Sequence, residues 1–103
     1  MKLVTTPQET ARLMKMGCPF PQSLQYAWGI TRDEAYSIGE LIDFLPKKIE
    51  GADLDIFTGR SQWFVRYENR RKNPCDAVRQ WESRELVDAL YDAVVKLKEE
   101  GVI

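Results

Sequence analysis

Two acidic residues with a spacing suited to metal chemistry lie in the middle of the chain. Asp53 and Asp55 are two positions apart, so on a β-strand their carboxylates point to the same face. Paired carboxylates of this kind hold Mg²⁺ in nucleases. Glu68 and Lys72 follow, but not at the Glu-x-Lys spacing of such enzymes. We interpret the pair as acids on a solvent face, possible partners of Arg66 across a hairpin, and keep a Mg²⁺-dependent nuclease as an alternative.

A basic stretch follows, from Thr58 to Pro74, with aromatic residues between its cations. The candidate nucleic-acid-binding residues in it are Arg60, Arg66, Arg70, Arg71 and Lys72. They fall on a predicted turn, a strand and a loop, with no helix to enter a major groove. The whole chain is slightly acidic, with a net charge of −1, whereas nucleic-acid-binding domains are usually basic. We expect weak, salt-sensitive binding of nucleic acid or none.

The chain has no histidine. This excludes Ser-His-Asp and Cys-His catalysis, and it excludes zinc sites built on histidine. The two cysteines, Cys18 and Cys75, cannot complete a tetrahedral zinc site within one chain, and we interpret them as small, semi-buried thiols rather than a disulfide. The serines lack a partner base, and no nucleotide-binding glycine motif occurs. The sequence therefore predicts no enzyme activity, no metal and no cofactor.

Length and composition predict a single globular domain over residues 1–103. Of these residues, 44% are hydrophobic and 30% are charged, which is ordinary for a soluble protein. The first ten residues lack the apolar segment of a signal peptide, and no apolar run is long enough to span a membrane. We therefore expect a cytoplasmic protein without a membrane partner.

Three helices are predicted from their caps and apolar spacing. A capping box at Thr6 and Glu9 begins a helix over about residues 7–16, and Gly17 ends it. A second box at Ser37 and Glu40 begins a helix that ends before Pro46. Ser83 is the predicted cap of a long last helix with an apolar stripe through Leu86, Leu90, Ala93 and Leu97, ended by Gly101.

Strands are predicted where apolar and polar residues alternate. Residues 23–28 alternate, and residues 29–36 are interpreted as a connection. The runs 52–58 and 62–68 flank a turn at Gly59 and predict a β-hairpin, and residues 76–82 are a third candidate strand of a meander. The order α-β-α-β-β-(β)-α predicts an α+β fold, with a small, mainly antiparallel sheet of three to four strands packed against three helices.

The alternation also assigns faces to the predicted hairpin. Trp63, Val65 and Tyr67 share a face that we predict to be buried on the helices. Phe57 and Phe64 fall on the opposite faces of their strands. Aromatic rings exposed on the open side of a small sheet suggest a surface for a partner.

Three segments resemble a known group of proteins. YSIGELIDFLP (36–46), WFVRYE (63–68) and WESRELVDALYDAVVKLKEEGVI (81–103) are similar, in this order, to segments of small uncharacterised proteins from prophages and mobile elements of gut bacteria. The chain departs from their pattern at Tyr36-Ser37, where Pro-Thr is usual. The resemblance implies an intracellular bacterial or phage-derived accessory protein of α+β fold, and it assigns no catalytic residues.

These observations together predict a small interaction protein without catalytic activity. The expected partner is another protein, and self-association stays open. The alternatives are a nucleic-acid-binding protein that uses residues 60–72 and the Mg²⁺-dependent nuclease.

Overall fold

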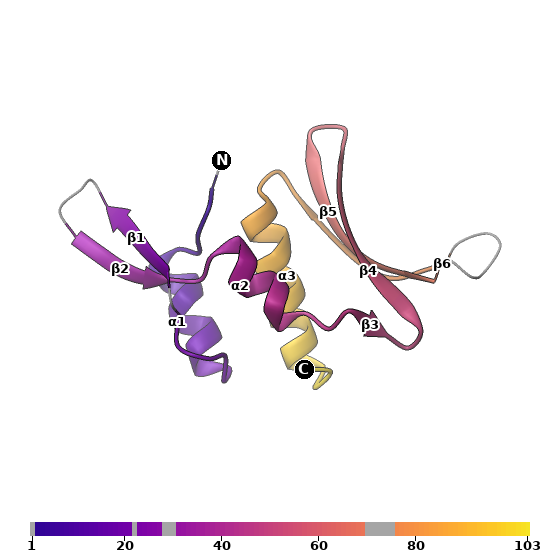
Figure 1. The fold of residues 1–103 in the computed structure, drawn as a ribbon, viewed down its shortest axis with the longest axis horizontal. Coiled ribbons are helices and arrows are strands. Elements are labelled where there is room, and N and C mark those ends of the chain that lie inside the picture. The colour runs from indigo at the N-terminus through magenta and orange to yellow at the C-terminus, as the bar shows by residue number, and fades with distance from the viewer. Residues whose placement is uncertain (1, 22, 28–30, 70–75) are drawn as a thin grey trace.

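The computed structural model describes residues 2–21, 23–27, 31–69 and 76–103. Of residues 23–27, 31–34 and 76–78, only the backbone is described. The fold is α+β, as predicted, with three helices and a four-stranded antiparallel sheet of order β3-β4-β5-β6. Two further strands, β1 and β2, form a separate antiparallel pair. The molecule is long and thin, with extents of 53 × 31 × 16 Å (Figure 1).

The first two helices begin at the predicted capping boxes. In α1 (Pro7–Lys15) the Thr6 hydroxyl accepts from the Glu9 N–H, and the Glu9 carboxylate accepts from the Thr6 N–H. In α2 (Ile38–Phe44) Ser37 and Glu40 make the same exchange. Each box satisfies two N–H groups that a helix start leaves unpaired. Gly17, with φ of 94°, ends α1 in the left-handed conformation expected of it.

The third helix, α3 (Leu86–Glu99), begins differently from the prediction. Its N-cap is Glu85, which makes no side-chain capping hydrogen bond. Ser83 is instead the last residue of β6 (Asp76–Ser83), and its hydroxyl accepts from the Glu85 N–H at 3.4 Å. The predicted cap was wrong because the strand runs directly into the helix, and this leaves Ser83 two residues short of the N-cap.

The predicted hairpin is confirmed as β4 (Ala52–Gly59) and β5 (Gln62–Asn69). Its turn consists of Arg60 and Ser61, both with positive φ, 50° and 67°. Two successive positive φ values are typical of the two-residue turns that fit the twist of a hairpin. Gly59, which we predicted to be in the turn, is instead the last residue of β4, and its φ is not positive.

The strand predicted over residues 23–28 is confirmed as β1 (Ser23–Ala27). Two short strands, β2 and β3, escaped prediction. β2 (Thr31–Ala35) pairs with β1, so the predicted connection over 29–36 contains a strand. The sequence TRDEA has no apolar alternation, which is why its strand character was not visible. β3 (Lys48–Ile49) pairs with the start of β4 across a turn at Glu50 and Gly51.

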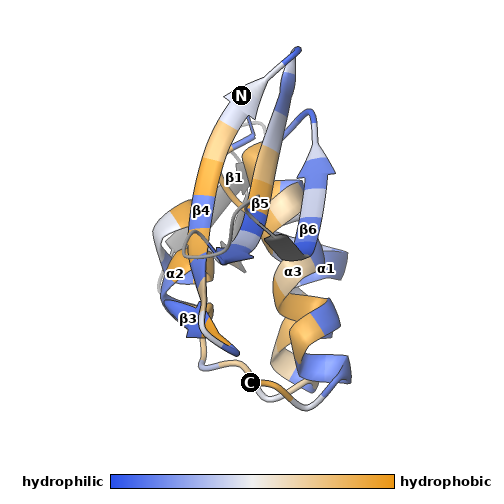
Figure 2. Cartoon of the chain, turned by 90° about the vertical axis from the view of Figure 1, so that its right-hand side faces the viewer, coloured by the Kyte–Doolittle hydropathy of each residue, from blue (hydrophilic) through white to orange (hydrophobic). Residues whose placement is uncertain are grey.

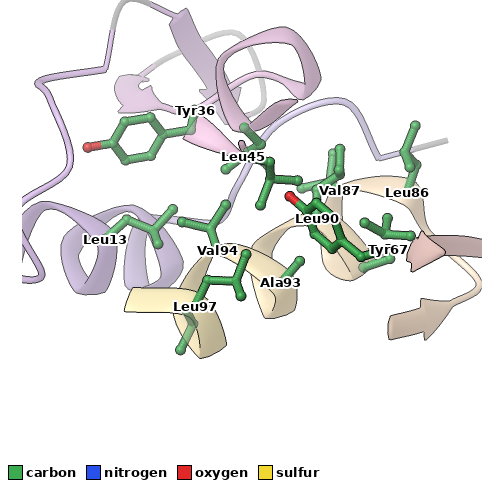
Figure 3. Packing of buried hydrophobic residues seen from close by; sticks show 14 of the residues in the cluster. Leu13, Tyr36, Leu45, Tyr67, Leu86, Val87, Leu90, Ala93, Val94 and Leu97 are labelled. Atoms are coloured by element: carbon green, nitrogen blue, oxygen red, sulfur yellow. The ribbon is translucent and has the colours of Figure 1, made fainter. Parts of the chain in front are cut away.

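The core lies between α3 and the sheet. Leu90, Val94 and Leu97 of α3 are fully buried, as are Val65 and Tyr67 of β5 (Figure 3). The helix α2 packs on α3, and Leu13 and Tyr36 extend the same cluster toward α1. The buried side of β5 is therefore the side predicted from the alternation of Trp63, Val65 and Tyr67, with Trp63 only partly buried at its end.

Candidate functional site

The four-stranded sheet has one face on α3 and a second face that we call the open face. Because successive side chains of a strand point to opposite sides, the burial of Val65 and Tyr67 on α3 places Phe64 and Arg66 on the other side. Figure 2 looks onto this side, with β4, β5 and β6 in front of the helices. By strand register, the open face comprises Asp53, Asp55, Phe57, Phe64, Arg66, Glu68, Gln80 and Glu82.

Two aromatic rings lie at the centre of the open face. Phe57 of β4 and Phe64 of β5 are directly opposite in the register. Their ring centroids are 5.1 Å apart and their planes are inclined by 13°, so the rings are stacked. Both residues are half-buried. Cross-strand aromatic pairs of this kind stabilise a sheet by about 0.2–1 kcal/mol relative to alanine pairs.

Arg66 lies beside this pair. Its guanidinium carbon is 4.6 Å from the centroid of the Phe57 ring, within cation–π distance. One of its terminal nitrogens is 3.5 Å from the Glu68 carboxylate. The Nε of Arg66 is buried and makes no hydrogen bond to any described residue. A guanidinium is therefore held, partly desolvated, against an aromatic ring on the outer side of the sheet.

The carboxylates of the predicted nuclease pair do share this face. Asp53 lies opposite Glu68, and Asp55 lies opposite Arg66 as expected. Asp53 is 3.6 Å from the ammonium of Lys48, and Glu68 pairs with Arg66. Within the described ranges, no three acidic or cysteine side chains form a group that could hold a metal ion.

Of the five predicted nucleic-acid-binding residues, the structure describes two, Arg60 and Arg66, and these lie in different places. Arg60 is exposed in the turn before β5, and Arg66 lies on the open face. Arg70, Arg71 and Lys72 lie outside the described residues. The proposed role of these cations in binding nucleic acid stays a prediction.

A second polar cluster, which the sequence did not reveal, joins α1 to α3. The ammonium of Lys2 is 2.9 Å from the Glu9 carboxylate and 2.6 Å from that of Asp88. The backbone N–H of Lys2 donates to Glu85 at 2.8 Å. This cluster explains why Asp88 and Asp92, two acids one helical turn apart, are tolerated. Lys2 neutralises one of them.

The pKa values in this cluster follow from burial and from the single ammonium. Burial is the largest single influence on Glu9 and would raise its pKa, but the hydrogen bonds from Lys2 and Thr6 and the charge of Lys2 together outweigh it, so the pKa is lowered. The pKa of Asp92 is raised by burial and by the charges of Asp88 and Glu9. The cluster binds the N-terminal segment to the last helix and presents no unpaired nucleophile, so we assign it a structural role.

Three buried ionisable groups also belong to the core. Tyr36 donates to the Pro19 carbonyl at 2.6 Å, and Tyr67 donates to the Pro46 carbonyl at 2.7 Å. Burial raises the pKa of each phenol to about 12. Burial likewise raises the pKa of the Cys18 thiol, which disfavours the reactive thiolate. Cys18 is thus the buried thiol predicted, whereas Cys75 lies outside the described residues.

The described residues enclose no pocket, and none of their helices has both the length and the apolar character needed to cross a bilayer. Comparison of the chain with protein-family models, with curated proteins and with solved structures gave no match. What the protein does must therefore be inferred from its own residues, and the open face is the part of the described surface with the most distinctive chemistry.

Proposed function

We propose that the chain is an interaction protein without catalytic activity, which binds a partner protein through its open face. The observation that carries this proposal is the stacked pair Phe57–Phe64 with the Arg66 guanidinium against it. Aromatic residues and arginine are enriched at the centres of protein interfaces, where a few such side chains provide most of the binding energy.

The charges around the aromatic pair indicate what kind of partner fits. Asp53, Glu68 and Glu82 lie on the same face, and Glu82 is exposed. Potentials of opposite sign favour encounter and orientation of partners. The partner we propose presents an apolar side chain to Phe57 and Phe64, with basic residues around it.

The same features make the open face a poor platform for nucleic acid. Base stacking requires an accessible aromatic face, but the Phe57 ring is already engaged by Phe64 and by Arg66. The acidic side chains of this face would also repel phosphates. The proposed absence of catalysis has a separate basis, namely the lack of histidine in the whole chain.

The test is an affinity capture from the native host that compares two phenylalanine variants. Phe64→Ser removes half of the stacked pair. Phe20→Ser makes the same change at a phenylalanine that is 54% exposed and lies outside the open face. Circular dichroism would first show that both variants are folded. We expect the wild type and Phe20→Ser to retain the same protein partner and Phe64→Ser to lose it.

The proposal would be wrong if both variants captured the partner equally. It would also be wrong if the captured material were nucleic acid rather than protein. In that second case, loss of nucleic acid in an Arg70/Arg71/Lys72→Ala triple variant would favour the alternative function. The origin in prophages or mobile elements, implied by the resemblance, stays a prediction.

A further inference from the structure

Along one edge of the main sheet, the part of the chain that the structure describes places no strand over most of the edge's length. β3 pairs with β4 only at Ala52 and Asp53, and the Lys47 carbonyl then accepts from the Leu54 N–H at 3.0 Å. Beyond that point, none of the described residues pairs with β4 on this side. Figure 1 shows the β4–β5 hairpin extending past the helices.

The unpaired backbone groups of this edge can be identified by alternation. In an antiparallel sheet, successive residues of a strand form hydrogen bonds to opposite sides. The Leu54 N–H points toward β3, so the N–H and carbonyl groups of Ile56 and Thr58 also point away from β5. These two residues present two donors and two acceptors at the edge.

The two edges of the sheet differ in how they are protected. β6, the other edge strand, pairs with β5 through an irregular register between Tyr67 and Glu68, and it includes the charged residues Arg79 and Glu82. Bulges and charges are common means of preventing unwanted strand pairing. The β4 segment from Leu54 to Gly59 reads LDIFTG. It contains one charged residue, Asp55, and no proline, no lysine and no bulge in its pairing with β5.

We propose that this edge pairs with β4 of a second copy of the chain, antiparallel and centred on Phe57. The available length sets this register. Lys47 stands opposite Leu54, and the turn begins at Arg60, so on the outer side of β4 the five backbone positions from Asp55 to Gly59 have no described strand beside them. A twofold axis at the middle position, Phe57, uses all of them.

This register satisfies the hydrogen-bonding groups and the charges. Ile56 falls opposite Thr58 of the second copy, and Thr58 falls opposite its Ile56, so the outward donors and acceptors of both residues meet. Asp55 falls opposite Gly59 of the second copy, and no like charges face each other. Such self-complementarity is what a twofold interface between identical chains requires.

The side chains of β4 also favour a second copy of the chain as the partner of this edge. Phe57 would lie across the axis from Phe57 of the second copy, which extends the stacked pair into a row of four rings. Cross-strand aromatic neighbours are favourable in sheets. On the other face, Ile56, which is partly buried at the margin of the core, would gain Thr58 of the second copy as a neighbour. The inference concerns the edge of β4 and does not depend on a foreign partner for the open face.

Sedimentation equilibrium of the purified chain tests the proposal. We expect the mass to rise from 12.0 kDa toward twice that value as the concentration increases. Thr58→Pro removes an outward N–H without removing a hydrogen bond to β5, which edge strands tolerate. It should weaken the dimer at least about tenfold, the effect of ~1.4 kcal/mol. Gln80→Pro makes the matched change on the edge of β6 and should leave the dimer unchanged.

Disulfide trapping tests the register directly, in chains with Cys18 and Cys75 replaced by serine. Two residues facing each other across the axis, in a pair without mutual hydrogen bonds, have Cα atoms about 4.5 Å apart, which suits a disulfide. Phe57→Cys should therefore cross-link two copies on mild oxidation. Asp55→Cys, on the same face, should not, because its counterpart lies about 13 Å along the strand.

Three results would overturn the proposal. They are a monomer at every concentration, a dimer equally affected by Thr58→Pro and Gln80→Pro or by neither, and equal cross-linking at positions 55 and 57. These measurements use the purified chain alone. Failure here would therefore leave the proposed binding of a foreign partner standing, and failure of the capture experiment would leave the dimer standing.

Discussion

The two faces of the main sheet are built from alternate residues of the same strands, yet their side chains pack against different partners. On the covered side, Val65 and Tyr67 are fully buried against α3. On the open side, Phe57 and Phe64 are half-buried and rely on each other and on Arg66. Burial by a second layer removes more apolar surface from water than a pair on an open sheet can. The covered side therefore stabilises the fold more than the open side, which is the proposed binding surface.

The largest expected effect is on the covered side, at Leu90. This residue is fully buried in α3, and truncation to alanine leaves a cavity that the surrounding side chains fill only in part. We expect Leu90→Ala to lower the free energy of unfolding by about 2–5 kcal/mol. Urea denaturation followed by circular dichroism would measure this. A loss below about 1 kcal/mol would mean that α3 is not the centre of the core, because surface changes have effects of that size.

An intermediate effect is expected at Tyr67, which combines burial with one hydrogen bond. Tyr67→Phe leaves the partly buried Pro46 carbonyl without its donor, which should cost about 1–1.5 kcal/mol, the low end of the range for an unsatisfied group. Burial raises the pKa of Tyr67 to about 12 from the ordinary phenol value of 10.0. The folded state thus holds the phenol proton more tightly than the unfolded state.

The stabilisation linked to this proton is complete below the unfolded pKa and is lost as pH rises toward 12. We therefore expect the wild type to lose more stability than Tyr67→Phe between neutral pH and pH 12. Denaturation curves at several alkaline pH values would show the difference. Parallel losses in the two proteins would contradict the raised pKa.

The smallest effect is expected on the open side. Phe64→Leu keeps apolar bulk but removes the stacked ring, which is worth about 0.5–1.5 kcal/mol for an aromatic pair. The unfolding free energy should fall by no more than that, as measured beside Leu90→Ala under the same conditions. If Phe64→Leu were the more destabilising of the two, the distinction between a supporting face and a binding face would fail.

Much of the fold was predictable because its signals are local. The capping boxes at Thr6 and Ser37 need only four residues each, and the apolar stripe of α3 repeats within one segment. The hairpin followed from two alternating runs around a short turn. These patterns record which side of each element is apolar, and so they also indicated that Phe57 and Phe64 lie opposite the buried face.

The rest depends on partners that are distant in the sequence or carry no apolar pattern. β2 is a strand because β1 pairs with it, since its own residues, TRDEA, are mostly polar. Lys2 gains its role only when α1 and α3 meet. The position of Arg66 over the Phe57 ring is likewise set by strand register. The sequence indicated that Asp55 and Arg66 face each other across the hairpin, but it did not indicate the contact between Arg66 and the Phe57 ring.

The bridge from Lys2 to α3 has a consequence for the order of folding. Its hydrogen bonds close sequence separations of 83 and 86 residues, whereas β4 and β5 are joined by a two-residue turn. Closing a long loop costs more chain entropy than closing a short one, and proteins fold more slowly as such distant contacts accumulate. We expect the hairpin to form early and α1 to dock late. In native-state hydrogen exchange, the amides of α1 should then open at lower free energy than those of β5, and equal protection would contradict this order.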